Sequence, residues 1–327
     1  MAQGSADHFR IGMLAPSGFG KTSLVTAILQ EALFATASRE LSMRAIGQST
    51  QGRLDRNRAQ LEAQLLNGKF DARALSGTRD AFDFQVQIEY GEQNVISVLL
   101  RDFPGTWISE QDRPTTRPLL ESTRIFIGNA TILLVPVDAV LVMESVRTGR
   151  VGDFAKLAAL DQLKKEALRW AAGRTRNAAE PALALICPIK CESYFADNGG
   201  TQDQADALRA AVVAFYADAL RPLLELKSAV PSARVLYAPV DTIGCVELAR
   251  VRGSGQEDML ESYVVREPSK LSRVGADDVM WAIHHHLLRV LRTSLDAEGA
   301  PASARTAELD QLLRRAAPVP GPRVREL

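Results

Sequence analysis

The residues best suited to chemistry form a short loop near the N-terminus. From Ala15 the chain reads Ala-Pro-Ser-Gly-Phe-Gly-Lys-Thr, which matches the pattern G-x-x-x-x-G-K-[ST] except at its first glycine. Such a loop wraps phosphates with backbone N–H groups, and Gly18 and Gly20 can adopt the dihedral angles that this requires. We expect Lys21 to reach the β- and γ-phosphates and the Thr22 hydroxyl to bind Mg²⁺. The residues expected to contact phosphate are Pro16, Ser17, Gly18, Phe19, Gly20, Lys21, Thr22 and Ser23.

The elements that flank this loop support its interpretation as a P-loop. Residues 11–14 are an apolar strand, and apolar residues recur with helical spacing from Leu24 to Leu33. The helix N-terminus would add free N–H donors and a partial positive charge. The alternative is an ordinary glycine-rich turn, which the combination of strand, loop and helix makes less favourable. Ala15 is compatible with a P-loop provided that its φ is negative.

A second candidate site follows a predicted β-hairpin. Residues 81–90 alternate between apolar and polar, residues 91–94 supply a turn, and residues 95–100 form the return strand. The return strand leads into Asp102-Phe-Pro-Gly105. An aspartate at this strand end can bind Mg²⁺ through a water, and Gly105 can turn its N–H toward a γ-phosphate. The alternative is a Pro-Gly turn, which any fold could use.

The remaining chain alternates between buried strands and helices. This pattern predicts a three-layer α/β P-loop NTPase fold, with a mainly parallel sheet, one antiparallel strand and helices on both faces. Strands are expected at 130–137, 181–187 and 233–240, with shorter ones at 246–251 and 262–266; helices are expected at 54–66, 154–172, 203–226 and 276–295.

The predicted organisation is one elaborated domain. Residues 1–7 are expected to be a flexible N-terminus and 8–295 the domain, while 296–327 would be a mobile tail with a short helix at 306–315. The segment 39–77 is too long for a simple loop and is interpreted as an insertion. It begins with a polar, irregular stretch at 39–53, and its own helix follows.

Composition narrows the function classes. Lys plus Arg and Asp plus Glu balance at 39 each, which gives no support for nucleic acid or an acidic membrane as the main partner. No signal peptide is evident, and the longest apolar run, 130–143, is too short to span a bilayer. Three cysteines indicate a reducing compartment, and the spacing of Cys187 and Cys191 is not that of most zinc sites. We therefore expect a cytoplasmic protein without a membrane span.

Two features of the later helices have structural interpretations. The consecutive histidines 284–286 point in three directions on a helix, so they cannot ligate one metal together and are predicted to lie on the helix surface. Asp138 ends a buried strand and is expected to cap the helix that follows.

Five polar candidate residues share one feature, which is that each comes just after a predicted strand. Lys21, Asp102, Lys190, Glu192 and Asp241 each follow the end of a predicted strand. Ligands of parallel sheets bind at the carboxyl ends of the strands, so these side chains are expected to meet there.

Together the P-loop, the strand ending in D-x-P-G and a later [NT]-K-x-D-like element resemble the GTPases of the translation-factor-related (TRAFAC) class, over residues 8–245. The insertion at 39–77 and the sequence Pro-Val-Asp-Thr-Ile-Gly at 239–244 are similar to the bacterial double-GTPase proteins, which are sometimes encoded with biological-conflict systems. The resemblance implies GTP or GDP and Mg²⁺ as cofactors.

The resemblance also implies a guanine site. In Ile-Lys-Cys-Glu, Lys190 would pack its stem on the base and Glu192 would accept hydrogen bonds from its N1 and N2. Ile189 and Glu192 depart from the family's usual Asn or Thr and Asp. A backbone N–H near Val240 and Asp241 would contact the base carbonyl.

Hydrolysis would depend on further residues that the resemblance implies. Thr78, with Thr50 as the second choice, would close over the γ-phosphate and Mg²⁺, and Arg79 would serve as an internal arginine finger. Thr106 stands where many members have Gln or His, so water would be poorly oriented and turnover slow. Loop residues that could move in are Glu110, Gln111 and Arg113. The expected catalytic residues are Lys21, Thr78, Arg79 and Gly105, and the expected metal ligands are Thr22, Thr78 and Asp102.

The sequence thus predicts a GTP-binding switch with slow Mg²⁺-dependent hydrolysis, which signals to a protein effector or co-encoded partner through the insertion or the tail. Two alternatives stay open. One is a P-loop ATPase or kinase-like enzyme. The other is a non-hydrolysing pseudo-GTPase scaffold.

Overall fold

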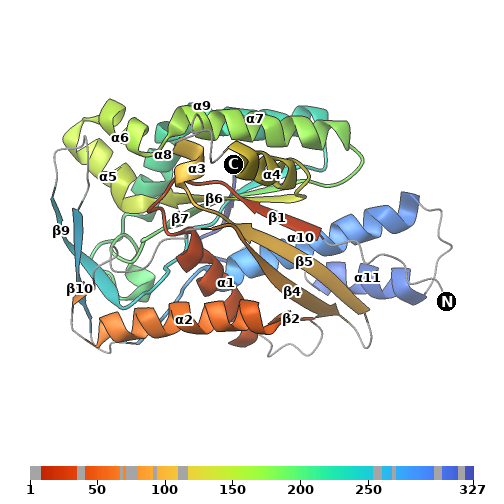
Figure 1. Cartoon of the computed structure of the whole chain (residues 1–327), viewed down its shortest axis with the longest axis horizontal. Helices are drawn as coiled ribbons and strands as arrows, with labels where there is room; N and C mark the ends of the chain where they lie inside the picture. The colour runs from red at the N-terminus through yellow and green to blue at the C-terminus, as the bar shows by residue number, and fades with distance from the viewer. Residues whose placement is uncertain are drawn as a thin grey trace.

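The computed structural model has a mixed α/β architecture, with a mostly parallel sheet flanked by helices (Figure 1). It describes residues 9–34, 41–66, 69–70, 80–90, 94–109, 117–252, 260–266, 270–297, 304–315 and 321–327. The expected N-terminal segment 1–7 lies outside these residues.

The main sheet has eight strands in the order β11-β8-β7-β6-β1-β5-β4-β2. The neighbours from β8 to β5 pair in parallel. Every residue of β6 and β7 is buried, as their uninterrupted apolar sequences require between two helical layers. The strands are β1 (Phe9–Met13), β2 (Leu41–Ala45), β4 (Phe82–Tyr90), β5 (Asn94–Asp102), β6 (Ile132–Asp138), β7 (Leu183–Ile189), β8 (Arg234–Tyr237) and β11 (Arg325–Glu326).

The edges of the sheet differ from the expectation of a single antiparallel strand. The predicted hairpin is confirmed, because β4 and β5 pair antiparallel along their full lengths. However, β2 also pairs antiparallel with β4, and β11 pairs antiparallel with β8. The stretch 39–53, which looked irregular, supplies β2 and the first turns of a helix, because edge strands need no strong apolar pattern.

Two helical layers cover the sheet (Figure 1). One holds α1 (Lys21–Phe34), α2 (Gln48–Leu65), α10 (Ala276–Ala297) and α11 (Ala304–Arg315). The other holds α3 (Thr106–Ser109), α4 (Arg117–Gly128), α5 (Ala139–Thr148), α6 (Val151–Leu157), α7 (Leu160–Arg176), α8 (Ala205–Phe215) and α9 (Ala217–Ala229). Each layer packs its own apolar cluster against the sheet.

Two predicted helices are interrupted in the structure. The helix expected at 154–172 breaks between α6 and α7, where Ala159 has a φ of 48°. The helix expected at 203–226 breaks at Tyr216, whose side chain is fully buried and whose ψ is 7°. Tertiary packing overrides a continuous helical pattern at both points. The predicted cap is confirmed, since Asp138 Oδ1 accepts from the Leu141 N–H at 3.0 Å.

A second, smaller sheet lies beside the carboxyl ends of the main strands. Its strands are β3 (Lys69–Phe70), β9 (Val246–Arg252) and β10 (Leu260–Val265), in the order β3-β10-β9 with antiparallel pairing. We call it the accessory sheet. It shares an apolar cluster with α2 that includes Leu61, Phe70, Val246 and Tyr263. The insertion therefore joins the β9–β10 hairpin in a single substructure.

The described residues of the C-terminal part are packed against the domain and do not form the mobile tail that the sequence predicted. Helix α11 packs against α10, and β11 adds to the edge of the main sheet. We call residues 321–327 the C-terminal strap. The predicted short helix at 306–315 is confirmed as α11.

The consecutive histidines are not all on the helix surface. His284 and His286 are buried in the layer formed by α1 and α10, so the surface prediction is wrong for both. All three cysteines are buried, and none forms a disulfide. Among the described helices, none combines the length and apolar character needed to cross a bilayer.

Candidate functional site

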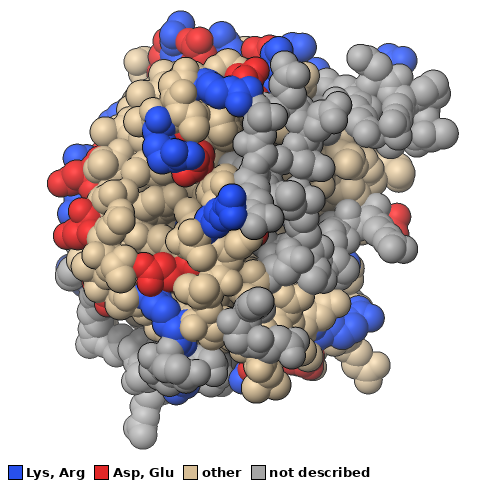
Figure 2. Space-filling view, turned by 90° about the vertical axis from the view of Figure 1, so that its left-hand side faces the viewer, with Lys and Arg blue, Asp and Glu red and all other residues tan. Residues whose placement is uncertain are grey.

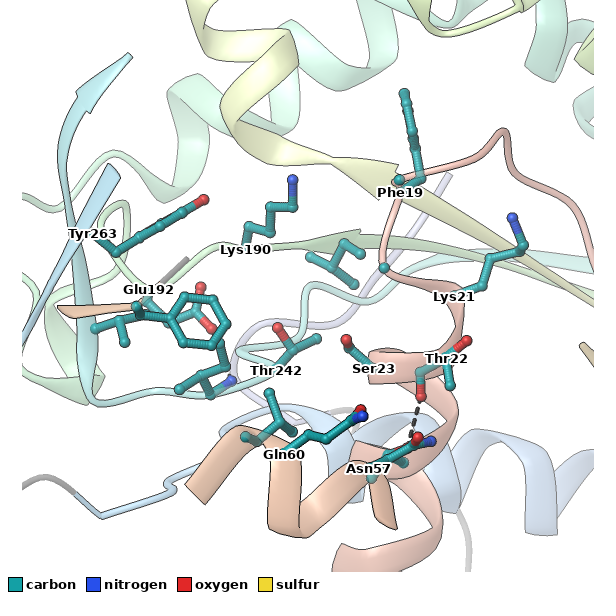
Figure 3. A pocket seen from close by; sticks show the side chains of 18 of the residues that line it. Phe19, Lys21, Thr22, Ser23, Asn57, Gln60, Lys190, Glu192, Thr242 and Tyr263 are labelled. Atoms are coloured by element: carbon teal, nitrogen blue, oxygen red, sulfur yellow. Dashed lines mark hydrogen bonds between the residues drawn. The ribbon is translucent and has the colours of Figure 1, made fainter. Parts of the chain in front are cut away.

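A long cavity lies at the carboxyl ends of the central strands (Figure 3). One end is formed by the loop after β1, here called the glycine loop (residues 15–20), and by the residues after β5. The other end is formed by residues after β7 and β8, with α2 and the accessory sheet as an outer wall. Its lining includes Ser17, Lys21, Thr22, Asn57, Gln60, Phe70, Phe103, Gly105, Ile189, Lys190, Glu192, Thr242, Ile243, Val246 and Tyr263.

The glycine loop has the backbone geometry that its sequence predicts. Gly18 and Gly20 have φ angles of 78° and 60°, in the left-handed region that favours glycine. A Cβ on Gly20 would also lie only 2.6 Å from the Ile189 side chain. Ala15 is not among the described residues with positive φ, so it fits without strain where the pattern has glycine.

Lys21 begins α1 and folds back over the glycine loop. Its Nζ donates to the carbonyl oxygens of Ala15 and Pro16, each at 2.8 Å. Burial lowers the pKa of Lys21 to about 8, against the opposing effect of the nearby Asp102 carboxylate. A phosphate group entering this end of the cavity would restore the favourable environment for the ammonium.

Thr22 and Asp102 form the polar pair at the same end. The Thr22 hydroxyl donates to Asp102 Oδ2 at 2.7 Å, and Asp102 is fully buried at the end of β5. A hydroxyl and a carboxylate are ligands that Mg²⁺ accepts while keeping several waters. The donor set therefore fits the metal role that the sequence assigns to these two residues. Arg53 on α2 also comes near, with its Nη2 3.9 Å from Asp102 Oδ2.

Gly105 lies directly against the glycine loop. A Cβ at this position would be 2.0 Å from the Ser17 nitrogen and 2.2 Å from the Pro16 carbonyl carbon. No side chain fits in this contact, so close backbone approach requires the glycine of Asp-Phe-Pro-Gly.

Lys190 has a strained backbone, and its partly buried side chain belongs to an ion network. Its φ is 58°, although it is not a glycine, and its Nζ donates to Asp138 Oδ2 at 2.5 Å and to Glu261 at 2.9 Å. Burial alone would lower the pKa of Lys190, but the two carboxylates outweigh it and raise the pKa above its usual value. Since Glu261 belongs to β10, this network fixes the accessory sheet to the end of β7. Strain of this kind is found most often at functional sites.

Glu192 is buried at the same end of the cavity. Its Oε1 accepts from the Ile243 N–H at 2.9 Å and from the Gly244 N–H at 3.3 Å. Burial and the neighbouring charge of Asp241 raise the pKa of Glu192 to about 7. The carboxylate thus organises the loop after β8 as well as lining the cavity.

The loop after β8 meets the cavity through residues other than those named from the sequence. Val240 is buried in a β-bridge with Ile189, and Asp241 accepts from Asn198 at 2.9 Å and from Arg323 at 3.0 Å. Neither lines the cavity, whereas Thr242 and Ile243 do. The residues of this loop that line the cavity therefore lie one to two positions after those named from the sequence.

Sequence reasoning missed the outer wall. Asn57 and Gln60 come from α2, Phe70 from β3 and Tyr263 from β10, and no motif marks them. The helical pattern of α2 and the aromatic residue in each strand were the available signals. Figure 3 shows Tyr263, Lys190 and Glu192 at one end of the cavity and Lys21 and Thr22 at the other.

The structure does not place most of the proposed catalytic-loop residues. Thr78, Arg79, Glu110, Gln111 and Arg113 lie outside the described residues. Thr50 is buried in α2, where its hydroxyl accepts from the Gln85 N–H of β4 at 3.2 Å, so it has a structural role there. Thr106 begins α3 and is exposed.

In the described part of the chain, no group of three or more His, Cys, Asp or Glu side chains is arranged so that it could hold a metal ion. No known family model matches the sequence, and no curated protein matches it.

Proposed function

We propose that this protein is a P-loop guanine-nucleotide switch that binds GTP or GDP with Mg²⁺ and hydrolyses GTP slowly. The observation that carries the proposal is the convergence of Lys21, Thr22, Asp102 and Gly105 on one glycine loop with two left-handed glycines. A loop of this kind at a helix N-terminus is suited to phosphates.

Each end of the cavity has a separate role in this proposal. Lys21 and the glycine loop would hold the β- and γ-phosphates, and Thr22 and Asp102 would hold Mg²⁺. Gly105 would sense the γ-phosphate, because its backbone already lies against Ser17 of the glycine loop. Hydrolysis would then release the loop after β5, which is the usual output of such switches.

The base would occupy the end near Lys190 and Glu192. The carboxylate of Glu192 would accept from the base, the Lys190 stem would lie along the ring, and Tyr263 and Phe70 would close the outer side. A protein effector or co-encoded partner would read the nucleotide state. The mixture of acidic and basic residues on the face in Figure 2 gives no reason to propose nucleic acid as that partner.

A second candidate is an ATPase of the same fold. Glu192 Oε1 is already engaged by two backbone N–H groups, which leaves less capacity for the two donors of guanine. The choice between guanine and adenine therefore depends on how the second carboxylate oxygen is used.

Calorimetry with GTP, GDP and ATP, each with and without Mg²⁺, tests the proposal. We expect tighter binding of GTP than of ATP, a gain from Mg²⁺, and loss of binding in Lys21→Ala. The matched control is Lys165→Ala, an exposed lysine on α7 in the opposite helical layer. Equal affinity for ATP would overturn the base assignment, and absence of binding to any nucleotide would overturn the whole proposal.

Turnover is the second measurement. We expect a low steady-state rate because Thr106 is a weak substitute for a residue that orients water. A rate comparable to that of fast ATPases in the isolated protein would contradict this part of the proposal.

A further inference from the structure

We propose that the C-terminal strap, through Arg323, positions the loop that forms the base end of the cavity. On this proposal the strap controls affinity for the nucleoside part of the ligand and not for its phosphates. The inference rests on the proposed function and assigns a positioning role to a segment outside every recognised motif.

Arg323 is buried among groups that suit a guanidinium. Its Nη2 donates to Asp241 Oδ2 at 3.0 Å, and its Nε donates to Asp197 Oδ2 at 2.8 Å. The guanidinium also stacks over the Phe195 ring at 3.9 Å from its centroid. The Arg323 side chain is 3% exposed and that of Asp241 is fully buried, so this is an interior ion pair and not a surface contact.

Asp241 connects this pair to the cavity. The residues that follow it are Thr242 and Ile243, which line the cavity, and Gly244. The N–H groups of Ile243 and Gly244 hold Glu192 Oε1. The path from Arg323 to the proposed base acceptor thus consists of a salt bridge, a short backbone segment and two hydrogen bonds.

The opposite side of the same loop is held by residues 272–274, and Asn198 links the two sides by donating to both Asp241 and the Ser272 carbonyl. Arg273 Nε donates to the Thr242 carbonyl at 3.2 Å, and the Ser272 N–H donates to the Ile243 carbonyl at 2.9 Å. A Cβ on Gly244 would lie 1.7 Å from the Ser272 carbonyl oxygen. The loop is therefore clamped between residues 272–274 on one side and the contacts of Arg323 and Asn198 to the Asp241 carboxylate on the other, and loss of Arg323 weakens that second side.

The positive charge of Arg323 also affects how readily the buried carboxylates at the base end ionise. Asp241 and Glu192 are close enough for the charge of Asp241 to raise the pKa of Glu192. Arg323 compensates Asp241 and opposes the rise in its pKa that burial causes. Without the guanidinium, two buried carboxylates would compete for ionisation, and a neutral Glu192 is a poorer acceptor for base N–H groups.

The C-terminal strap is attached to the domain at two places besides Arg323. Strand β11 pairs with β8 over Arg325 and Glu326, and Gly321 approaches Asp278 so closely that a Cβ would lie 1.8 Å from its Oδ1. The phosphate end has no residue in contact with the strap among the described contacts, and the two ends can therefore be separated by experiment.

The test compares GDP with inorganic tripolyphosphate, which lacks a base, by calorimetry on Arg323→Ala, Arg323→Lys and the control Arg325→Ala. Arg325 lies in the same strap and is exposed. We expect Arg323→Ala to weaken GDP binding about tenfold or more while tripolyphosphate binding changes less than about twofold. Arg323→Lys should recover part of the GDP affinity, and Arg325→Ala should match the wild type.

The outcomes separate this inference from the proposed function. A wild-type protein that fails to bind GDP overturns the proposed function, whereas unchanged GDP affinity in Arg323→Ala overturns only the role of the strap. Parallel loss of GDP and tripolyphosphate binding also overturns it, because the effect would then be general. If Arg323→Ala does not fold, Asp197→Asn decides, since Asp197 is half-exposed: a smaller, GDP-specific loss supports the proposal and no loss overturns it.

Discussion

Replacing Gly105 with alanine tests whether the loop after β5 reads the γ-phosphate. The added Cβ would start 2.0 Å from the Ser17 nitrogen, whereas ordinary contact begins near 3.4 Å, so one loop must retreat by about 1.4 Å. The glycine loop is held by the two Lys21 hydrogen bonds and by the packing of Gly20 on Ile189. The loop around Gly105 should therefore be the one that moves.

A displacement of this size has a defined kinetic consequence. Misplacement of a catalytic group by about 1 Å can cost about 10²-fold in rate, so we expect single-turnover GTP hydrolysis to fall by about two orders of magnitude. GDP affinity should change less than about twofold, because the β-phosphate contacts stay in place. The assay is single-turnover hydrolysis with calorimetry for GDP and GTP.

The control for this experiment is Gly152→Ala. Gly152 lies in α6 with no atom within 4 Å of the added Cβ, so the variant should keep wild-type hydrolysis and gain slightly in stability. Wild-type hydrolysis in Gly105→Ala would refute the reasoning. So would a loss of GDP affinity as large as the loss of rate.

Three further predictions follow from the site and the core. GDP affinity should rise by about tenfold between about pH 6 and about pH 8, because the Glu192 carboxyl group ionises near pH 7, and it should fall at higher pH as Lys21 loses its proton near pH 8. Calorimetry at several pH values checks this, and tripolyphosphate, which has no base, should show only the fall at high pH. A pH-independent GDP affinity would contradict both assignments. Thr22→Ala should abolish the gain in GTP affinity that Mg²⁺ provides, measured against a chelator, while Thr148→Ala on α5 should keep it. Burial lowers the pKa of His284 to about 4 and that of His286 to about 3 in the folded protein. As the pH falls below 6.5, these histidines are therefore protonated in the unfolded chain but not in the folded one. The free energy of unfolding should then decrease by about 1.4 kcal/mol per pH unit for each histidine, until the pH reaches the folded-state pKa of that histidine. Urea unfolding at several pH values checks this, and His284→Leu with an unchanged slope would contradict it.

The central fold was predictable because its elements carry strong local signals. The buried runs in β6 and β7, the alternation in β4 and the helical stripe of α1 each identify their element without tertiary information. The conformation of the glycine loop was predictable for the same reason, since the two left-handed glycines lie within one short stretch of sequence; its role in binding phosphate stays a prediction.

The base end was harder to predict because its geometry depends on contacts between distant segments. Asp241 stands in the expected position, but Arg323 and Asn198 draw its carboxylate away from the cavity. His284 and His286 were misjudged because their neutral rings can be buried, which a count of polar residues on a helix does not reveal. The strap strand β11 has only two residues, both charged, and β2 alternates apolar and polar residues over only five positions, so neither is long enough for its pattern to stand out.

The accessory sheet has a consequence for the order in which the chain becomes competent during synthesis. Its strand β3 pairs with β10, which lies more than half the chain away, and Arg273 bonds Gln30 across 243 positions. Closing such distant contacts is slow and requires both partners to have left the ribosome. The contacts of the glycine loop involve residues up to Ile189, whereas the outer wall of the cavity and the clamp on the loop after β8 can assemble only when synthesis is almost complete. In the proposed function, a nascent chain would therefore complete the phosphate end of the cavity before the base end, and full nucleotide binding would mark a finished molecule.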